Sequence, residues 1–185
     1  MKKILIGQIL LVICCLFYLC WWYRGYRPDA AVSRISGMNG LLLFLTAAFG
    51  AAGLICSLTK IPELAEPKIS PMLIVIGGIA LYFALLVITC FVFQRVVTTE
   101  LFLITGWLML EMTVINRLYS AEILTDRGFL IMCAVIVLAF VISIILYVAY
   151  YRMEEMKAFY AAMVPLVTEA AAMAVLTVVV ITGRT

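Results

Sequence analysis

The chain contains no histidine and little charge, since only 12% of its 185 residues are Asp, Glu, Lys or Arg. The missing histidine excludes haem and metal sites built on imidazole ligands, and it excludes histidine as a general base. The net charge of +3 is too small to indicate nucleic-acid binding. We therefore expect no cofactor, no metal site and no nucleic-acid partner.

Catalytic motifs are absent as well. The sequence has no G-x-S-x-G, no H-E-x-x-H, no glycine-rich phosphate loop and no pair of aspartates within an apolar run. Its six cysteines form no C-x-x-C motif, which favours small buried side chains over a redox centre. These absences predict that the chain is not an enzyme.

Apolar residues dominate the composition. They make up 67% of the chain, and the mean hydropathy is +1.22. A soluble domain of this length cannot bury that much apolar surface, so a lipid bilayer must be the solvent. The runs are apolar on every side for about twenty residues, which indicates helices rather than the alternating strands of a membrane barrel. We predict an all-α, multi-pass protein with one transmembrane domain (1–185) in the inner (plasma) membrane of a bacterial cell.

The runs predict a bundle of six transmembrane helices, at about 4–23, 39–59, 71–93, 100–119, 129–151 and 157–182. The first, third and fifth helices end in aromatic residues and arginine, which is typical of a membrane surface. Small residues such as Gly50 and Gly53 predict that the second helix packs tightly on a neighbour, with a dimer contact as the alternative. Pro165 should kink or locally loosen the sixth helix.

Two glutamates, Glu111 and Glu169, lie near the middle of the fourth and sixth predicted helices. A charged group at that depth costs roughly 2.5–3.5 kcal/mol on insertion scales. At ~1.5 Å per residue both lie close to the midplane, so they could meet inside the bundle. The nearest basic residue is Arg117, six positions beyond Glu111 and on another face of the helix. Acids in this setting must stay protonated, share a proton or bind a cation.

Four further side chains are candidates for stacking on, or hydrogen-bonding to, a solute at this site: Trp107, Tyr82, Asn116 and Thr168. Trp107 lies one turn before Glu111, and Thr168 adjoins Glu169. The other polar groups at membrane depth are Gln8, Thr46 and Thr113.

Two functions fit this pattern. The first is a small membrane transporter or solute-binding membrane protein whose midplane carboxylates take a cation, a protonatable solute or a proton. The alternative is a non-catalytic structural or accessory subunit of a larger membrane complex, in which protonated glutamates hold helices together by hydrogen bonds. Either protein could act as a homodimer or with a partner membrane subunit. Exchange of both glutamates for glutamine should be tolerated only in the second case.

Overall fold

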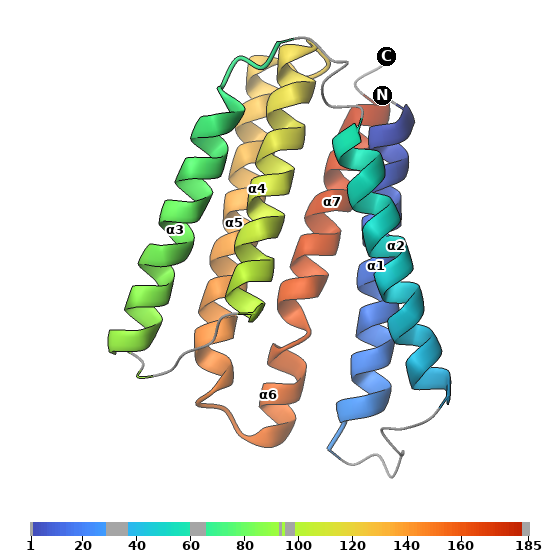
Figure 1. Ribbon diagram of the computed structural model, residues 1–185, viewed down its shortest axis with the longest axis vertical. Coiled ribbons are helices and arrows are strands. Elements are labelled where there is room, and N and C mark those ends of the chain that lie inside the picture. Colours follow the sequence, from blue (N-terminus) through green and yellow to red (C-terminus); the bar gives the residue numbers. More distant parts are fainter. Residues whose placement is uncertain (1, 29–36, 60–65, 93, 95–98, 183–185) are drawn as a thin grey trace.

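The computed structural model describes residues 2–28, 37–59, 66–92, 94 and 99–182. Within these ranges every regular element is an α-helix (Figure 1). The helices are α1 (Lys2–Tyr26), α2 (Gly37–Thr59), α3 (Pro71–Val92), α4 (Thr99–Ser120), α5 (Asp126–Tyr150), α6 (Glu155–Ala161) and α7 (Val164–Thr182). Six spans are long and apolar enough to cross a membrane, with α6 and α7 together forming the sixth. The predicted six-helix fold is confirmed.

The observed helix ends lie within three residues of the predicted ones. The predicted end of the third helix at Phe93 lies just outside the described residues. The fifth helix begins earlier than predicted because Thr125 caps it: Thr125 Oγ1 accepts a hydrogen bond from the backbone N–H of Gly128 at 3.1 Å. This cap satisfies an N–H that the first turn would otherwise leave without a partner.

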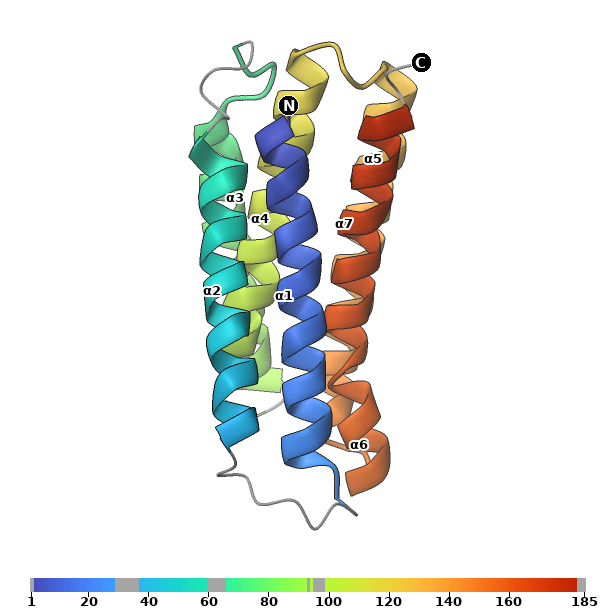
Figure 2. The same cartoon turned by 90° about the vertical axis from the view of Figure 1, so that its right-hand side faces the viewer.

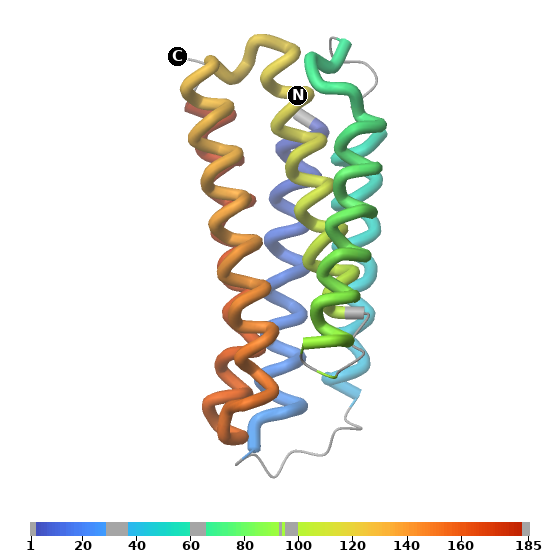
Figure 3. Tube along the Cα trace, turned by 90° about the vertical axis from the view of Figure 1, so that its left-hand side faces the viewer, coloured from blue at the N-terminus to red at the C-terminus, as the bar shows by residue number. Residues whose placement is uncertain are grey.

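Four helices form the core of the bundle, and both termini lie at the same end of it (Figure 1). Helix α7 lies between α1 and α5, and α4 packs on α5. Helices α1 and α4 are connected by a hydrogen bond between Gln8 and Glu111, so the four helices surround a common interior. Helix α2 packs on the outside of α1 and α3 on the outside of α4 (Figures 2 and 3). The core is therefore made of α1, α4, α5 and α7, with α2 and α3 as flanking helices.

The contact between α1 and α2 is close because glycines face each other across it. A Cβ atom on Gly7 would overlap Ser57 Oγ and would lie 2.8 Å from the backbone nitrogen of Ser57. A Cβ atom on Gly53 would lie 2.8 Å from Leu11 Cγ. The predicted tight packing of the second helix is confirmed, and Gly53 makes its contact within the chain.

The sixth span is interrupted, as the position of Pro165 predicts. Helix α6 ends at Ala161 and α7 begins at Val164. Pro165 has no N–H, so it cannot donate to the carbonyl of Ala161 and the helical ladder stops there. Met163 N donates instead to Tyr160 O at 3.0 Å, in a tighter turn. The break leaves a short helix at the end opposite the termini and a longer one through the core.

Candidate functional site

Each core helix turns a polar side chain into the bundle. Glu111 of α4 and Ser143 of α5 are fully buried, at 0% exposure. Gln8 of α1 and Glu169 of α7 are 1% and 8% exposed. Both predicted glutamates therefore face the protein interior and not the lipid. A polar cluster formed by Gln8, Glu111, Ser143 and Glu169 is the candidate site.

Glu111 is held by one hydrogen bond from another helix. Gln8 Nε2 donates to Glu111 Oε1 at 3.1 Å. The amide oxygen of Gln8, Oε1, and the other carboxyl oxygen of Glu111, Oε2, are buried and have no hydrogen-bond partner in the described part of the chain. The pair thus presents two buried acceptors and lacks a donor for them.

Glu169 lies across the core on α7. Its carboxyl group bonds to the hydroxyl of Ser143, and its Oε1 is buried without a partner in the structure as described. Glu169 lies within electrostatic range of Glu111, and Cys15 of α1 lies within range of both. Neither carboxyl forms an ion pair with any described residue. The two acids therefore share one electrostatic environment that holds no compensating basic group in the ranges described.

Thr168 is turned back to its own helix. Its Oγ1 donates to the carbonyl of Pro165 at 2.8 Å and lies 3.5 Å from Ser143 Oγ. It therefore joins the edge of the polar cluster through Ser143, while its own hydrogen is used within α7. Because the hydroxyl of Thr168 already donates to the carbonyl of Pro165, it could donate to a solute only if this hydrogen bond were broken.

Trp107 connects the apolar parts of the core. Its ring packs against all three apolar clusters, one of which contains Leu11 and Cys15 of α1 and Ala170 and Met173 of α7. Its Nε1 is buried and has no partner among the described residues. Trp107 Nε1 is thus a hydrogen-bond donor without an acceptor among the described residues. It lies in the same helical core as three acceptors without a donor, namely Gln8 Oε1, Glu111 Oε2 and Glu169 Oε1.

The last two sequence candidates have other surroundings. Tyr82 lies on the flanking helix α3, where its ring contacts Phe102 at 6.0 Å between centroids. Asn116 forms a two-way clamp with the backbone of Ile69: its Oδ1 accepts from Ile69 N at 3.1 Å and its Nδ2 donates to Ile69 O at 2.7 Å. This clamp fastens the segment before α3 to α4, so Asn116 has a structural use that its sequence position did not reveal.

Two members of the cluster were not among the predicted site residues. Gln8 was identified only as a polar group at membrane depth, and Ser143 was not singled out. Each is an isolated polar residue in a long apolar run, and that isolation is the signal that could have found them. The direction in which they point is not encoded locally, because a helix that is apolar on every side has no distinct inner face.

The Asn116→Ala variant should be less stable than the wild type by about 1–3 kcal/mol, because it removes two part-buried hydrogen bonds to the backbone of Ile69. Proton or solute flux in vesicles should be unchanged. Thermal unfolding in detergent and vesicle flux measure the two effects, with Thr113→Ala as the control, since Thr113 bonds only the carbonyl of Met109 in its own helix. If Asn116→Ala loses flux while its stability is unchanged, Asn116 binds the solute and its role is not structural.

The six spans around a buried polar cluster define a multi-pass helical membrane protein. Comparison with known proteins gives no match: no family model, no curated protein and no solved structure matches the chain. Within the ranges described, no group of three or more Cys, Asp or Glu side chains could hold a metal ion.

Proposed function

We propose that the chain is a small membrane transporter or solute-binding membrane protein in which Glu111 and Glu169 take up a proton or a cation. The observation that supports it is the burial of both carboxyl groups without a basic partner among the described residues. An ionised carboxylate in apolar surroundings is far less stable than a neutral or paired one. Positive charge must then come from outside the protein, and its binding and release is the elementary step of transport.

Hydrogen-bond accounting favours the proton as the bound species. A proton on Glu111 would provide the donor that Gln8 Oε1 and Glu111 Oε2 lack. A proton on Glu169 would remove the second buried negative charge. A hard divalent ion needs about six oxygen ligands, which would take every side-chain oxygen of the cluster, including Glu111 Oε1 that already accepts from Gln8 Nε2. A protonatable solute that donates to both acids would satisfy the same groups.

The side of the cluster toward the termini is largely apolar. Between the cluster and that end, the core contains buried apolar side chains such as Ile4 of α1, Leu118 of α4, Ile136 of α5 and Val180 of α7. Buried polar side chains on the same side, such as Asn116 of α4 and Thr177 of α7, donate to backbone carbonyls. On this proposal, release toward the termini requires a second conformation.

The structural alternative is supported by one observation, the hydrogen bond between Gln8 and Glu111. Such bonds between membrane helices contribute about 0.6–2 kcal/mol, which offsets part of the cost of placing a glutamate in the membrane. The chain would then be an accessory subunit of a larger complex. A non-catalytic role, a bacterial inner membrane and assembly as a homodimer or with a partner subunit stay predictions in both cases.

Flux measurements decide between the two. Vesicles containing the purified protein and an internal pH dye would be exposed to a pH gradient. The Glu111→Gln, Glu169→Gln double variant should carry protons slower by about tenfold or more, because both titratable groups are gone. Glu100→Gln is the matched control, since Glu100 is an exposed glutamate of the same helix α4.

Two results would remove the transport proposal. One is a double variant that carries protons as fast as the wild type, which favours the accessory subunit. The other is wild-type flux no greater than that of protein-free vesicles, with and without added organic amines as solutes. Correct folding of each variant is checked by its elution as the same species in detergent.

A further inference from the structure

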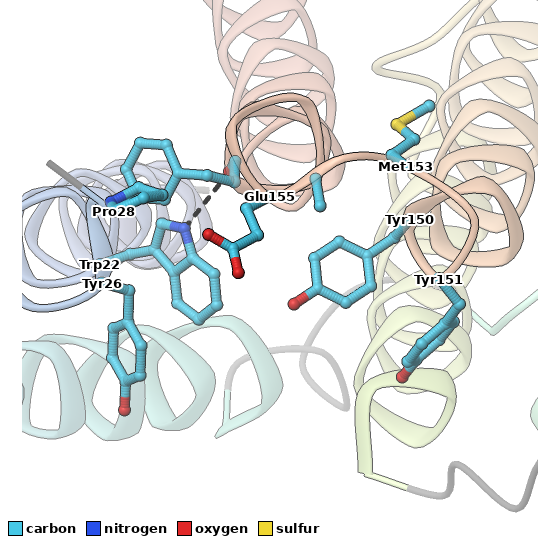
Figure 4. A pocket seen from close by; sticks show the side chains of 9 residues that line it. Trp22, Tyr26, Pro28, Tyr150, Tyr151, Met153 and Glu155 are labelled. Carbon is cyan, nitrogen blue, oxygen red and sulfur yellow. Dashed lines mark hydrogen bonds between the residues drawn. The ribbon is translucent and has the colours of Figure 1, made fainter.

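A second polar feature lies at the end of the molecule opposite the termini. It is a pocket of about 470 Å³ between the end of α1, the turn after α5 and helix α6 (Figure 4). Pockets that bind small molecules have volumes of about 300–1,000 Å³. Its aromatic lining consists of Trp22, Tyr26, Tyr150, Tyr151 and Phe159. Glu111 and Glu169 do not line it, so it is independent of the function proposed above.

The aromatic walls are fixed by their own contacts. The ring of Trp22 stacks on Tyr26 at 4.6 Å and on Phe159 at 6.3 Å between centroids. Trp22 Nε1 also donates to the backbone carbonyl of Phe159 at 3.4 Å. On the other side, Tyr150 meets Tyr151 edge to face at 5.0 Å. Little side-chain freedom would be lost on binding, which favours affinity.

One charged side chain lines the pocket, and it is acidic. The carboxylate of Glu155 points into the space between Trp22 and Tyr150 (Figure 4). The neighbouring Lys157 is paired with Glu154 at 2.9 Å, and it does not line the pocket. Among the described residues no ion pair involves Glu155. The pocket therefore combines aromatic walls with a negative charge that no described residue pairs.

These properties select one class of ligand. The carboxylate of Glu155 repels anions. A neutral apolar ligand would remove this carboxylate from water without giving it a positive partner, which costs free energy. A metal ion would find a single carboxylate where it needs about six oxygen ligands. An organic ammonium ion has a spread, weakly hydrated charge that binds both to a carboxylate and to aromatic rings. We propose that the pocket bounded by Trp22, Tyr150 and Glu155 binds an organic ammonium cation.

The ammonium group could belong to a free solute or to a lipid headgroup, because the pocket lies where the helices end and aromatic residues mark the membrane surface. Both sources present the same chemistry. They differ in one respect: a choline headgroup in the bilayer would already occupy the pocket and would compete with a free cation. Bilayer composition can therefore separate them.

The test uses the full chain in nanodiscs of phosphatidylglycerol, titrated with tetramethylammonium and followed by tryptophan fluorescence. Saturable binding is expected in the wild type, and Glu155→Gln should weaken it by about tenfold or more. The Glu154→Gln, Lys157→Gln double variant is the matched control, because it removes an ion pair outside the pocket and leaves no unpaired lysine beside it. The neutral isostere tert-butanol should bind the wild type no better than tetramethylammonium binds Glu155→Gln.

Nanodiscs of phosphatidylcholine identify the source. Loss of tetramethylammonium binding there supports the proposal with a headgroup as the occupant, and unchanged binding supports it with a free solute. The proposal is overturned if tetramethylammonium shows no saturable binding in phosphatidylglycerol. It is equally overturned if Glu155→Gln binds as tightly as the wild type, or if tert-butanol binds as tightly as the cation.

Discussion

Glu169→Gln alone is expected to lower proton flux by about tenfold or more, whereas Glu111→Gln should lower it less. The difference follows from the partners of the two carboxyl groups. A glutamine at position 111 can still bond to the amide of Gln8, so the contact between α1 and α4 survives. Glu169 is 8% exposed whereas Glu111 is 0% exposed, so an incoming proton reaches the carboxyl group of Glu169 more readily.

The comparison requires both single variants in the same vesicles, with flux normalised to the amount of inserted protein. Thr177→Val serves as the control on the same helix, because its buried hydroxyl donates to the backbone carbonyl of Met173. A larger loss in Glu111→Gln than in Glu169→Gln would reverse the assignment of the two roles. Full activity in both would contradict the site.

Gly7→Ala should destabilise the protein by about 1–3 kcal/mol, although glycine is a poor residue inside a helix. The new Cβ would meet both the side chain and the backbone nitrogen of Ser57, so α1 and α2 must move apart. Gly40 of α2 offers the matched control, because a Cβ there has no atom within 4 Å. Alanine at that position should be neutral or stabilising by up to about 1 kcal/mol.

The two glycine variants are compared by thermal unfolding in the same detergent. Opposite signs are expected because only Gly7 lies in a close helix crossing. Stabilisation by Gly7→Ala would show that the two helices are farther apart than described, and the packing of α1 would have to be revised.

The number of spans, and their ends to within three residues, could be predicted from the sequence, because both depend on the length of each apolar run. The same applies to the break at Pro165, since a missing N–H acts locally. The inward direction of Glu111 and Glu169 followed from the cost of placing a carboxyl group in lipid. These predictions needed no knowledge of which helices are neighbours.

The roles of the other candidate residues depended on which helices and segments pack against each other. Asn116 looked like a ligand group because its partner, the backbone of Ile69, belongs to a segment 47 residues away in the chain. Tyr82 was a candidate because its ring can stack on a solute and its hydroxyl can form a hydrogen bond. Its helix, however, packs on the outside of α4. Ser143 became part of the cluster only because α5 and α7 lie side by side. In an apolar helix without a polar face, the sequence alone does not specify such contacts.

The central claim is that the core holds two carboxyl groups that obtain positive charge from outside the protein. Infrared spectroscopy of the wild type and of the Glu111→Gln, Glu169→Gln variant tests it most directly, at neutral pH in a buffer whose only small cation is the proton. The difference spectrum should contain the carbonyl stretch of a protonated carboxylic acid, shifted on transfer to D₂O. A difference spectrum that contains only ionised carboxylate would contradict the account.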